Sequence, residues 1–193
     1  ALNGGTLSIS SGSALGSGPL AINLASGGTF LTVSNTAAVA LPNAIALPAP
    51  ATAQTYTLLK HAAGTGAGTP LDLAGTISGG NATATLFLNS NTSGDTTTTY
   101  RFSAANTFRA TINLNRGGIV VGHPQGLGSP DNLVYLNGNG NATLGDLRFD
   151  VSATLPHPVQ LVNAPSPIHT GTNRVALSGA VSGEMSSVNQ RLF

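Results

Sequence analysis

Asp146 and Asp150, with Arg148 between them, are the acidic residues whose spacing best suits general acid and base catalysis. In an extended strand all three side chains would point to one face of a sheet, while Leu147 and Phe149 point to the other. At a rise of ~3.3 Å per residue the carboxylates would be about 13 Å apart, whereas the paired carboxylates of glycosidases lie about 5–9.5 Å apart. The spacing therefore favours a solvated, salt-bridged stripe over a catalytic pair.

The other ionisable residues form no recognisable catalytic or metal-binding motif. Four further acids stand alone, so a catalytic pair would require acids from different parts of the chain to converge, an arrangement that stays open; they are Asp72, Asp95, Asp131 and Glu184. The histidines lack the H-x-H and H-E-x-x-H spacings of metal sites; they are His61, His123, His157 and His169. Cysteine is absent. We therefore assign no catalytic, cofactor-binding or metal-binding residue and expect no cofactor.

Three further features resemble binding sites but have simpler explanations. Residues 137–144 (NGNGNATL) resemble a calcium-binding nonapeptide, but Ala142 occupies the position of its aspartate, which favours a turn. Residues 64–68 (GTGAG) lack the third glycine of a dinucleotide-binding loop. A local run of arginines could meet an anionic polysaccharide, although scattered surface arginines are the commoner explanation; these are Arg101, Arg109 and Arg116.

Composition and charge are typical of a globular chain. The 193 residues are 40% hydrophobic and 7% charged, whereas disordered segments combine a low apolar content with a high net charge. A formal charge of +1 disfavours binding to nucleic acid or to an anionic membrane surface. No apolar run approaches the ~18 residues of a membrane-spanning helix. Residues 1–5 lack the features of an export signal, so we expect any such signal to be removed or to lie upstream.

The same composition opposes helices and favours strands. The chain has 25 Gly and 11 Pro, which cost about 1 and 3 kcal/mol, respectively, in a helix interior. Apolar and polar residues alternate in short segments bounded by turn residues, as expected of strands with one buried face. These segments lie at residues 6–10, 20–24, 29–33, 100–102, 111–114 and 146–151. The pattern predicts an all-β fold.

An internal repeat relates residues 1–87 to residues 113–193, joined by residues 88–112. Four pairs of segments align in the same order: 5–9 with 117–121, 15–17 with 127–129, 41–42 with 155–156, and 73–79 with 177–183. A repeat of roughly 100 residues comprises several layers of a strand solenoid, because each layer needs about 20–30 residues. We therefore interpret residues 1–193 as a single β-solenoid segment, a window of a longer array.

Residues 100–108 (YRFSAANTF) and 111–121 (TINLNRGGIVV) resemble the autotransporter-associated β-strand repeat. That family has an apolar strand, a Ser-Gly-Ala-Asn-Thr-Tyr segment, a Gly-Gly-Thr-Thr segment and a Gly-Thr-Leu strand. Here Ala104 replaces the usual Gly, Phe108 replaces the usual Tyr, and the Gly-Gly-Thr-Thr segment is only weakly kept. With residues 13–20, the resemblance covers about two thirds of the chain. It implies a right-handed parallel β-helix from a large bacterial surface or secreted protein, and it transfers no catalytic residue.

Two folds agree with these patterns. In a right-handed parallel β-helix, layers about 4.8 Å apart would stack like residues on like, with apolar side chains inside. Tandem immunoglobulin-like β-sandwiches are the alternative, since they also repeat near ~100 residues, but the chain lacks the Trp of their core. We expect the parallel β-helix.

The leading functional hypothesis is a non-catalytic, extracellular structural and adhesive segment of a bacterial surface or secreted protein. End-to-end self-association into a filament is part of this hypothesis, and neighbouring repeats or a host or matrix glycan or protein would be the partners. The alternative is a polysaccharide lyase or hydrolase built on a β-helix. A lectin-like module is disfavoured, because aromatic residues make up 5% of the chain and Trp is absent.

Overall fold

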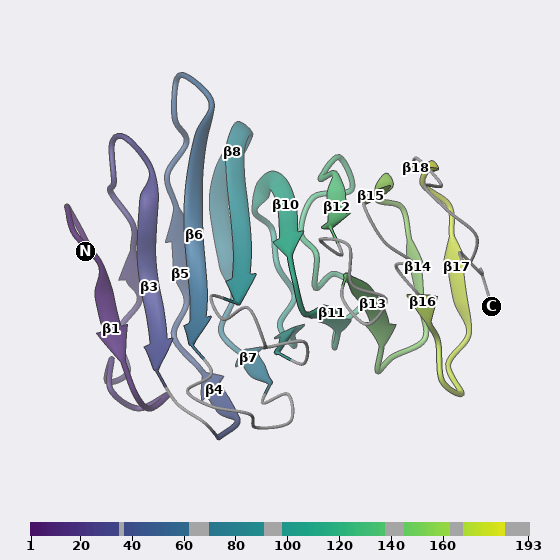
Figure 1. Cartoon of the computed structure of the whole chain (residues 1–193), viewed down its shortest axis with the longest axis horizontal. Coiled ribbons are helices and arrows are strands. Elements are labelled where there is room, and N and C mark those ends of the chain that lie inside the picture. The colour runs from purple at the N-terminus through teal and green to yellow at the C-terminus, as the bar shows by residue number, and fades with distance from the viewer. Residues whose placement is uncertain (35–36, 62–69, 91–97, 138–144, 163–167, 184–193) are drawn as a thin grey trace.

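Short strands of alternating burial make up the computed structural model, which describes residues 1–34, 37–61, 70–90, 98–137, 145–162 and 168–183. Every strand pairing in these ranges is parallel, and none of these residues is helical. The strands coil into a right-handed parallel β-helix of about six turns (Figure 1). The predicted fold is confirmed, and the immunoglobulin alternative is wrong because its sheets are antiparallel.

The largest sheet has ten strands and runs the length of the described column. Eight of them follow one another in the order β1-β3-β6-β8-β10-β12-β15-β18, with β2 and β5 paired beside this path. The strands are β1 (Leu7–Ile9), β2 (Leu20–Ala21), β3 (Gly28–Ser34), β5 (Ile45–Leu47), β6 (Gln54–His61), β8 (Ile77–Ser90), β10 (Arg109–Asn115), β12 (Val134–Asn137), β15 (Val159–Val162) and β18 (Val181–Gly183).

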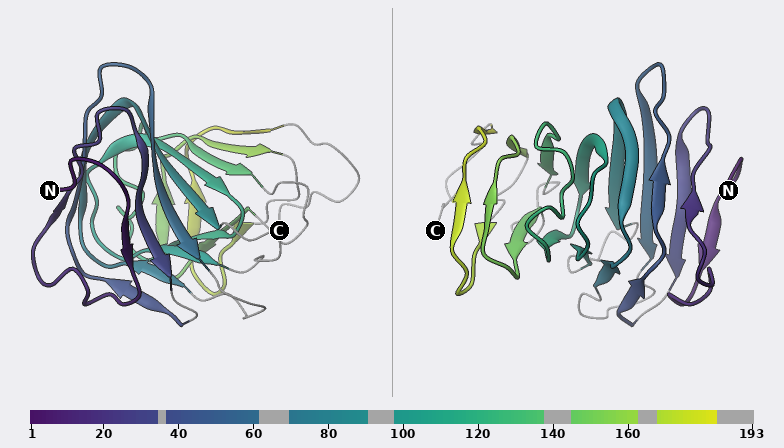
Figure 2. Two further views of the ribbon diagram at one scale, coloured as in Figure 1. Left: turned by 60° about the vertical axis from the view of Figure 1, so that its left-hand side comes forward. Right: turned by 180° about the vertical axis from the view of Figure 1, so that it is seen from behind.

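A six-stranded sheet and a two-stranded sheet complete the coil. The six-stranded sheet has the order β16-β13-β11-β9-β7-β4, and β14 pairs with β17. Their bounds are β4 (Val39–Leu41), β7 (Leu71–Leu73), β9 (Thr99–Phe102), β11 (Gly118–Val121), β13 (Asp146–Phe149), β14 (Ala153–Leu155), β16 (Ile168–His169) and β17 (Val175–Leu177). Figure 2 shows the strands wound around a common interior, with β1 and β17 towards opposite ends of the column.

Stacked leucines form the core side of the ten-stranded sheet. Strand register places seven leucines in one column, each the direct partner of the next: Leu7, Leu31, Leu58, Leu88, Leu114, Leu136 and Leu161. The five central members are at most 1% exposed. A parallel column of this kind buries each side chain against identical neighbours above and below as well as against the opposite sheet.

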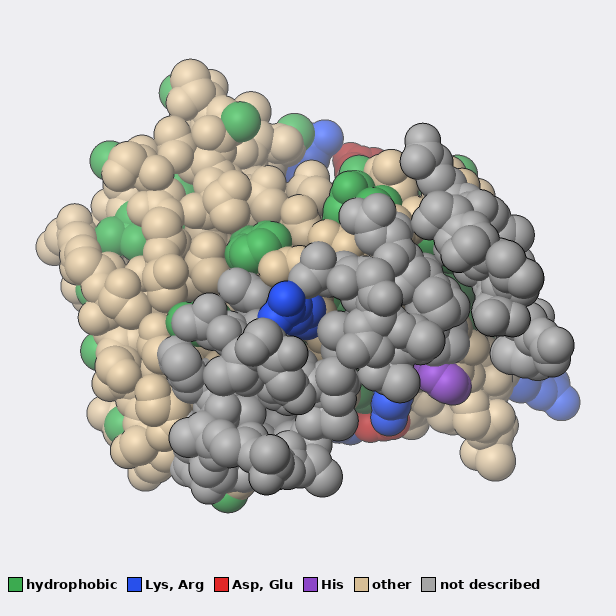
Figure 3. All heavy atoms as spheres, viewed as in Figure 1, with side chains coloured by type: hydrophobic (Ala, Val, Ile, Leu, Met, Phe, Trp, Pro, Cys, Tyr) green, Lys and Arg blue, Asp and Glu red, His purple; other side chains and the backbone are tan. Residues whose placement is uncertain are grey.

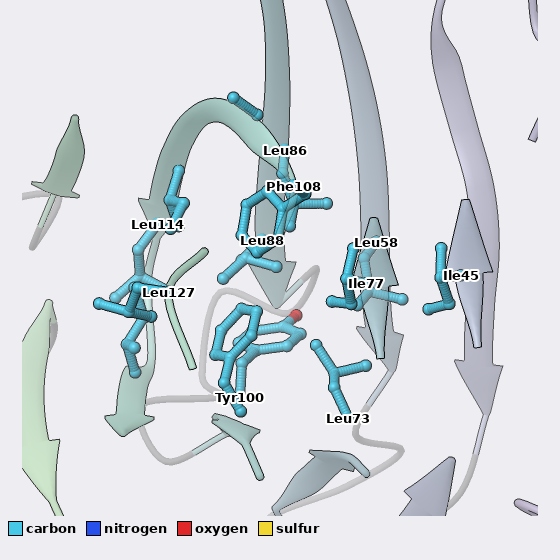
Figure 4. Close-up of a cluster of buried hydrophobic side chains, with 14 of the residues drawn as sticks. Ile45, Leu58, Leu73, Ile77, Leu86, Leu88, Tyr100, Phe108, Leu114 and Leu127 are labelled. Carbon is cyan, nitrogen blue, oxygen red and sulfur yellow. The ribbon is translucent and has the colours of Figure 1, made fainter. Parts of the chain in front are cut away.

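The six-stranded sheet supplies the opposite wall of the core. Its inward residues form two columns: Val39, Leu71, Tyr100, Ile119, Leu147 and Ile168, and beside them Leu41, Leu73, Phe102, Val121 and Phe149. Figure 4 shows Leu58, Leu88 and Leu114 on one side of this interior and Leu73 and Tyr100 on the other. The core is thus one continuous apolar interior between two walls.

Lys60 interrupts the apolar interior. It is the only lysine of the sequence, and it lies fully buried on β6 beside Val33 of β3. Its backbone N–H donates a hydrogen bond to the hydroxyl of Tyr100 at 3.3 Å. The alternation of β6 places Lys60 on the same inward side as Tyr56 and Leu58, so strand period alone accounts for the direction of this side chain.

Buried asparagines join successive layers at the corners of the coil. Asn132, which is 1% exposed, accepts the N–H of Ala110 at 2.9 Å and donates to the carbonyls of Phe108 and Leu127 at 3.1 and 2.8 Å. Asn106 is also buried and bonds to the backbone of two other layers. These amides satisfy backbone groups that lose their ladder partners where the strands end.

Asn43 and His157 occupy equivalent corners in the two halves of the predicted repeat. Asn43 follows residues 41–42 (LP) and donates from Nδ2 to the carbonyls of Gly16 and Gly18 at 3.0 and 2.7 Å. His157 follows residues 155–156 (LP), and its ring lies against the backbone of residues 127–129. Residues 15–17 align with residues 127–129 in the predicted repeat. Each corner side chain therefore lies against the equivalent segment of the preceding layer.

The alignment of residues 5–9 with 117–121 is not reproduced by the sheets. Residues 5–9 contain β1 of the ten-stranded sheet, whereas residues 117–121 contain β11 of the six-stranded sheet. The repeat boundaries at 1–87 and 113–193, with the connection at 88–112, stay a prediction.

Candidate functional site

The charged residues of the six-stranded sheet stand on its outward side. Because neighbouring residues of a strand point to opposite faces, the residues between the core positions form an outward column. Strand register gives this column as Ala40, Asp72, Arg101, Val120, Arg148 and His169. The column therefore brings Asp72, which the sequence shows as an isolated acid, next to Arg101 of the following layer.

Arg101 is the centre of a cluster that spans several layers. Its Nη1 lies 3.2 Å from Oδ2 of Asp72, and its Nε lies 2.9 Å from Oδ2 of Asp150. Ser103 accepts a hydrogen bond from Nη1 of Arg101 and donates its hydroxyl to Oδ1 of Asp72. Two acids from different layers thus converge on one guanidinium, the arrangement that the sequence left open.

Gly122 lets Arg101 reach Asp150. A methyl group at Gly122 would lie 3.0 Å from Cζ of Arg101 and 3.1 Å from Nη2. Gly122 follows β11, the layer between Arg101 on β9 and Asp150 after β13. Without a side chain at this position, the guanidinium passes over the intervening layer.

Asp146 and Asp150 belong to two separate ion pairs. Asp146 pairs with Arg148, and its carboxylate is only 5% exposed, whereas Asp150 is 50% exposed and pairs with Arg101. The Oδ1 of Asp146 fills the space beside Gly118, its partner on β11, where a larger residue would clash. The three residues do not form one stripe in which both acids flank Arg148.

The hydrogen bonds of the cluster connect its own groups to one another. The hydrogen bond from Arg101 to Asp150 raises the pKa of the guanidinium above its ordinary value; burial opposes this shift, and the charges of Asp72 and Asp150 add to it. Partly exposed ion pairs of this kind contribute about 0–1 kcal/mol each. The cluster is therefore suited to joining neighbouring layers of the coil. If it took part in catalysis, Asp72 and Asp150 would be the residues able to transfer a proton.

The described histidines are dispersed. His123 accepts the N–H of Gln125 at its Nδ1 at 3.1 Å, His169 is exposed on β16, and His157 is buried. Within the described ranges, no three His, Asp or Glu side chains converge in a way that could hold a metal ion. Arg109 pairs with Asp131 at 3.5 Å, and so two members of the predicted basic run, Arg101 and Arg109, are ion-paired.

Several sequence predictions fall outside the described residues. They are the loop at 64–68, the acids Asp95 and Glu184, residues 138–144 of the calcium-like segment, and the side chain of His61. These predictions stay as the sequence made them.

The burial of His157 predicts that the fold is less stable at acidic pH. The residue is 3% exposed, and neither ring nitrogen has a hydrogen-bond partner among the described residues. Burial lowers the pKa of His157 below 6.5, and the backbone of residues 127–129 only partly opposes this shift. Below about pH 6.5 the unfolded chain therefore binds more protons than the folded one. The free energy of unfolding is expected to fall as the pH falls from 6.5 towards the lower pKa of the folded state.

Urea unfolding at a series of pH values between about 7.5 and 5 measures this effect. The matched variant is His157→Asn, which places at this corner the residue that Asn43 provides in the other half. This variant is expected to lose the part of the pH dependence that comes from burial of the imidazole. An identical pH dependence in the parent and in His157→Asn would show that His157 is not its source.

Comparisons with known proteins provide no relative. No protein-family model, curated protein or solved structure matches the chain. Within the described ranges there is also no helix of the length and apolarity needed to cross a membrane.

Proposed function

We propose that the chain is a non-catalytic extracellular structural and adhesive segment of a bacterial surface or secreted protein. The observation that carries this proposal is the unbroken stacking of the core, in which the leucine column passes through seven layers. A rod held together by contacts between successive layers extends in one dimension and presents long side faces. Such a shape suits a segment that extends away from a surface and binds partners along its sides.

The charge distribution supports this proposal. Asp72 and Asp150 each pair with Arg101, and Asp146 pairs with Arg148. Stacked like charges would repel each other in parallel layers, whereas uncharged polar side chains do not. The resemblance of residues 100–121 to the autotransporter-associated repeat supports the extracellular, bacterial part of the proposal.

Self-association is the part of the proposal that concerns partners. Among the described strands, β1 pairs only with β3 and β18 pairs only with β15. A strand edge of this kind offers backbone donors and acceptors to another strand, so copies are expected to stack end to end. Light scattering over a wide concentration range is expected to show a molecular mass that rises with concentration. A constant monomer mass would contradict self-association.

A turnover screen tests the non-catalytic part. The chain is incubated with xylan, laminarin, polygalacturonate and alginate, and new reducing ends and unsaturated products are measured. No turnover of any polymer is expected, because the acids of the cluster are bonded to Arg101 and Ser103. Turnover by the purified chain would contradict the proposal.

The polysaccharide-degrading alternative has one observation in its favour, the convergence of Asp72 and Asp150 on Arg101. If turnover were found, Asp72→Asn and Asp150→Asn would test whether it arises there. The matched control is Asp131→Asn, an exposed acid that pairs with Arg109 outside this cluster. Loss of turnover in Asp72→Asn and Asp150→Asn, with turnover kept in Asp131→Asn, would support the polysaccharide-degrading hypothesis.

A further inference from the structure

Two aromatic side chains lie outside the core. Among the aromatic residues whose side chains the structure describes, Phe87 and Tyr135 are partly exposed, and the others are buried: Phe30, Tyr56, Tyr100, Phe102, Phe108 and Phe149. Both lie at outward positions of the ten-stranded sheet, Phe87 on β8 and Tyr135 on β12. Partly exposed aromatic rings combine an apolar face with access to solvent, which suits contact with a ligand.

The two rings belong to the same outward column. Strand register pairs Phe87 with Asn113 and Asn113 with Tyr135. Thr57 precedes Phe87 in this column and Gln160 follows Tyr135. Polar and aromatic residues therefore alternate over five layers. At ~4.8 Å per layer the two aromatic positions are about 9.6 Å apart along the axis of the coil.

Uncharged residues, most of them polar, flank this aromatic column. The neighbouring outward positions on one side are Thr55, Thr85 and Thr111. On the other side are Asn115 and Asn137, whose amides are joined at 3.4 Å, and the apolar residues Leu59 and Val162 continue this side on β6 and β15. No Asp, Glu, Lys or Arg occupies any of these positions. The space-filling view in Figure 3 shows a hydrophobic patch over β8 within a tan surface of backbone and uncharged side chains, with Lys or Arg atoms further below it.

We propose that the outward column Thr57, Phe87, Asn113, Tyr135 and Gln160 binds a neutral polysaccharide chain that lies along the axis of the coil. The apolar C–H face of a pyranose ring packs on an aromatic ring, and hydroxyl and amide side chains between the rings bond to sugar hydroxyls. The separation of the two rings is close to the length of a disaccharide unit in an extended chain. A uronic-acid polymer fits poorly, because the column offers its carboxylates no cation.

This inference rests on the proposed adhesive function and names its partner class. It differs from the cluster around Arg101 in position, since the column lies on the ten-stranded sheet and the cluster on the six-stranded one. Binding and chemistry can therefore be separated by mutation.

Isothermal titration calorimetry with the full chain tests the inference. The probes are cellohexaose, laminarihexaose and mannohexaose, with hexagalacturonate as the anionic comparison. At least one neutral probe is expected to bind, and Phe87→Ala and Tyr135→Ala are each expected to weaken it by about tenfold or more, which corresponds to ~1.4 kcal/mol. Tyr135→Phe keeps the ring and is expected to retain most of the binding.

The controls separate this inference from the proposed function. Val181→Ala removes an exposed hydrophobic side chain outside the column and is expected to leave binding unchanged. Unfolding curves check that Phe87→Ala and Tyr135→Ala remain folded, as expected for partly exposed positions. Absence of binding to every neutral probe, or equal binding by both folded Ala variants, would overturn the inference and leave the non-catalytic proposal standing. Turnover of a bound probe would overturn that proposal and leave the binding column standing.

Discussion

Replacing Leu88 by Ala is expected to lower the free energy of unfolding by about 2–5 kcal/mol. Leu88 is fully buried on β8, and it is the direct partner of Leu58 in the preceding layer and Leu114 in the following one. The shorter side chain would leave a cavity between two layers, and the neighbouring leucines are fixed by their own strands and can fill it only partly.

Thermal or urea unfolding of Leu88→Ala measures this loss. The matched control is Thr85→Ala on the same strand, because Thr85 points outward and is partly exposed. The control is expected to change stability by no more than about 0.5 kcal/mol. Equal losses in the two variants would show that Leu88 does not occupy a stacked core column.

Replacing Gly80 by Ala is expected to lower the free energy of unfolding by about 2–5 kcal/mol. Gly80 has a φ of +72°, which costs an L-residue about 1–2 kcal/mol. A Cβ at this position would also meet the carbonyl oxygen of Arg109 in the next layer, well inside van der Waals contact. Forcing the two layers apart adds about 1–3 kcal/mol.

Gly16→Ala isolates the contribution of the layer contact. Gly16 also has a positive φ, +62°, but a Cβ there would meet no atom within 4 Å. This control therefore carries the conformational strain alone, and its loss on urea unfolding is expected to be smaller than that of Gly80→Ala. If Gly16→Ala were as destabilising as Gly80→Ala, close stacking at Gly80 would be excluded.

The short strands were predictable because their alternation is local. Residues 29–33 and 111–114 lie inside β3 and β10, and residues 100–102 lie inside β9, as the alternating patterns indicated. Three segments were predicted too long: residues 6–10 contain the three-residue β1, residues 20–24 contain the two-residue β2, and residues 146–151 contain a β13 that ends at Phe149. Strand ends depend on pairing with the next layer, which a local pattern does not contain.

The longest strand was missed for a different reason. β8 spans Ile77–Ser90 and passes through Gly79 and Gly80, both with positive φ. Adjacent glycines followed by Asn81 are typical of a turn in a sequence. In the fold they mark a bend at which one strand leaves β5 and continues beside β6 and β10.

The cluster around Arg101 was predictable only in part. The sequence separates Asp72 and Arg101 by 29 residues, and so neither stands out as a partner of the other. A signal does exist in the repeated apolar-charged-apolar pattern of residues 71–73 (LDL), 100–102 (YRF) and 147–149 (LRF). Stacking these segments in register aligns their charged residues. The contact between Arg101 and Asp150 depends on the absence of a side chain at Gly122, and only the structure shows it.

Methyl-labelled leucine in a solution NMR experiment tests the central claim, that successive turns of the chain stack in parallel register. Nuclear Overhauser contacts are expected between Leu58 and Leu88, between Leu88 and Leu114, and between Leu114 and Leu136, because each pair consists of direct partners. Close Hα–Hα contacts between neighbouring strands, which are typical of antiparallel pairing, together with missing contacts between these leucines, would contradict the account.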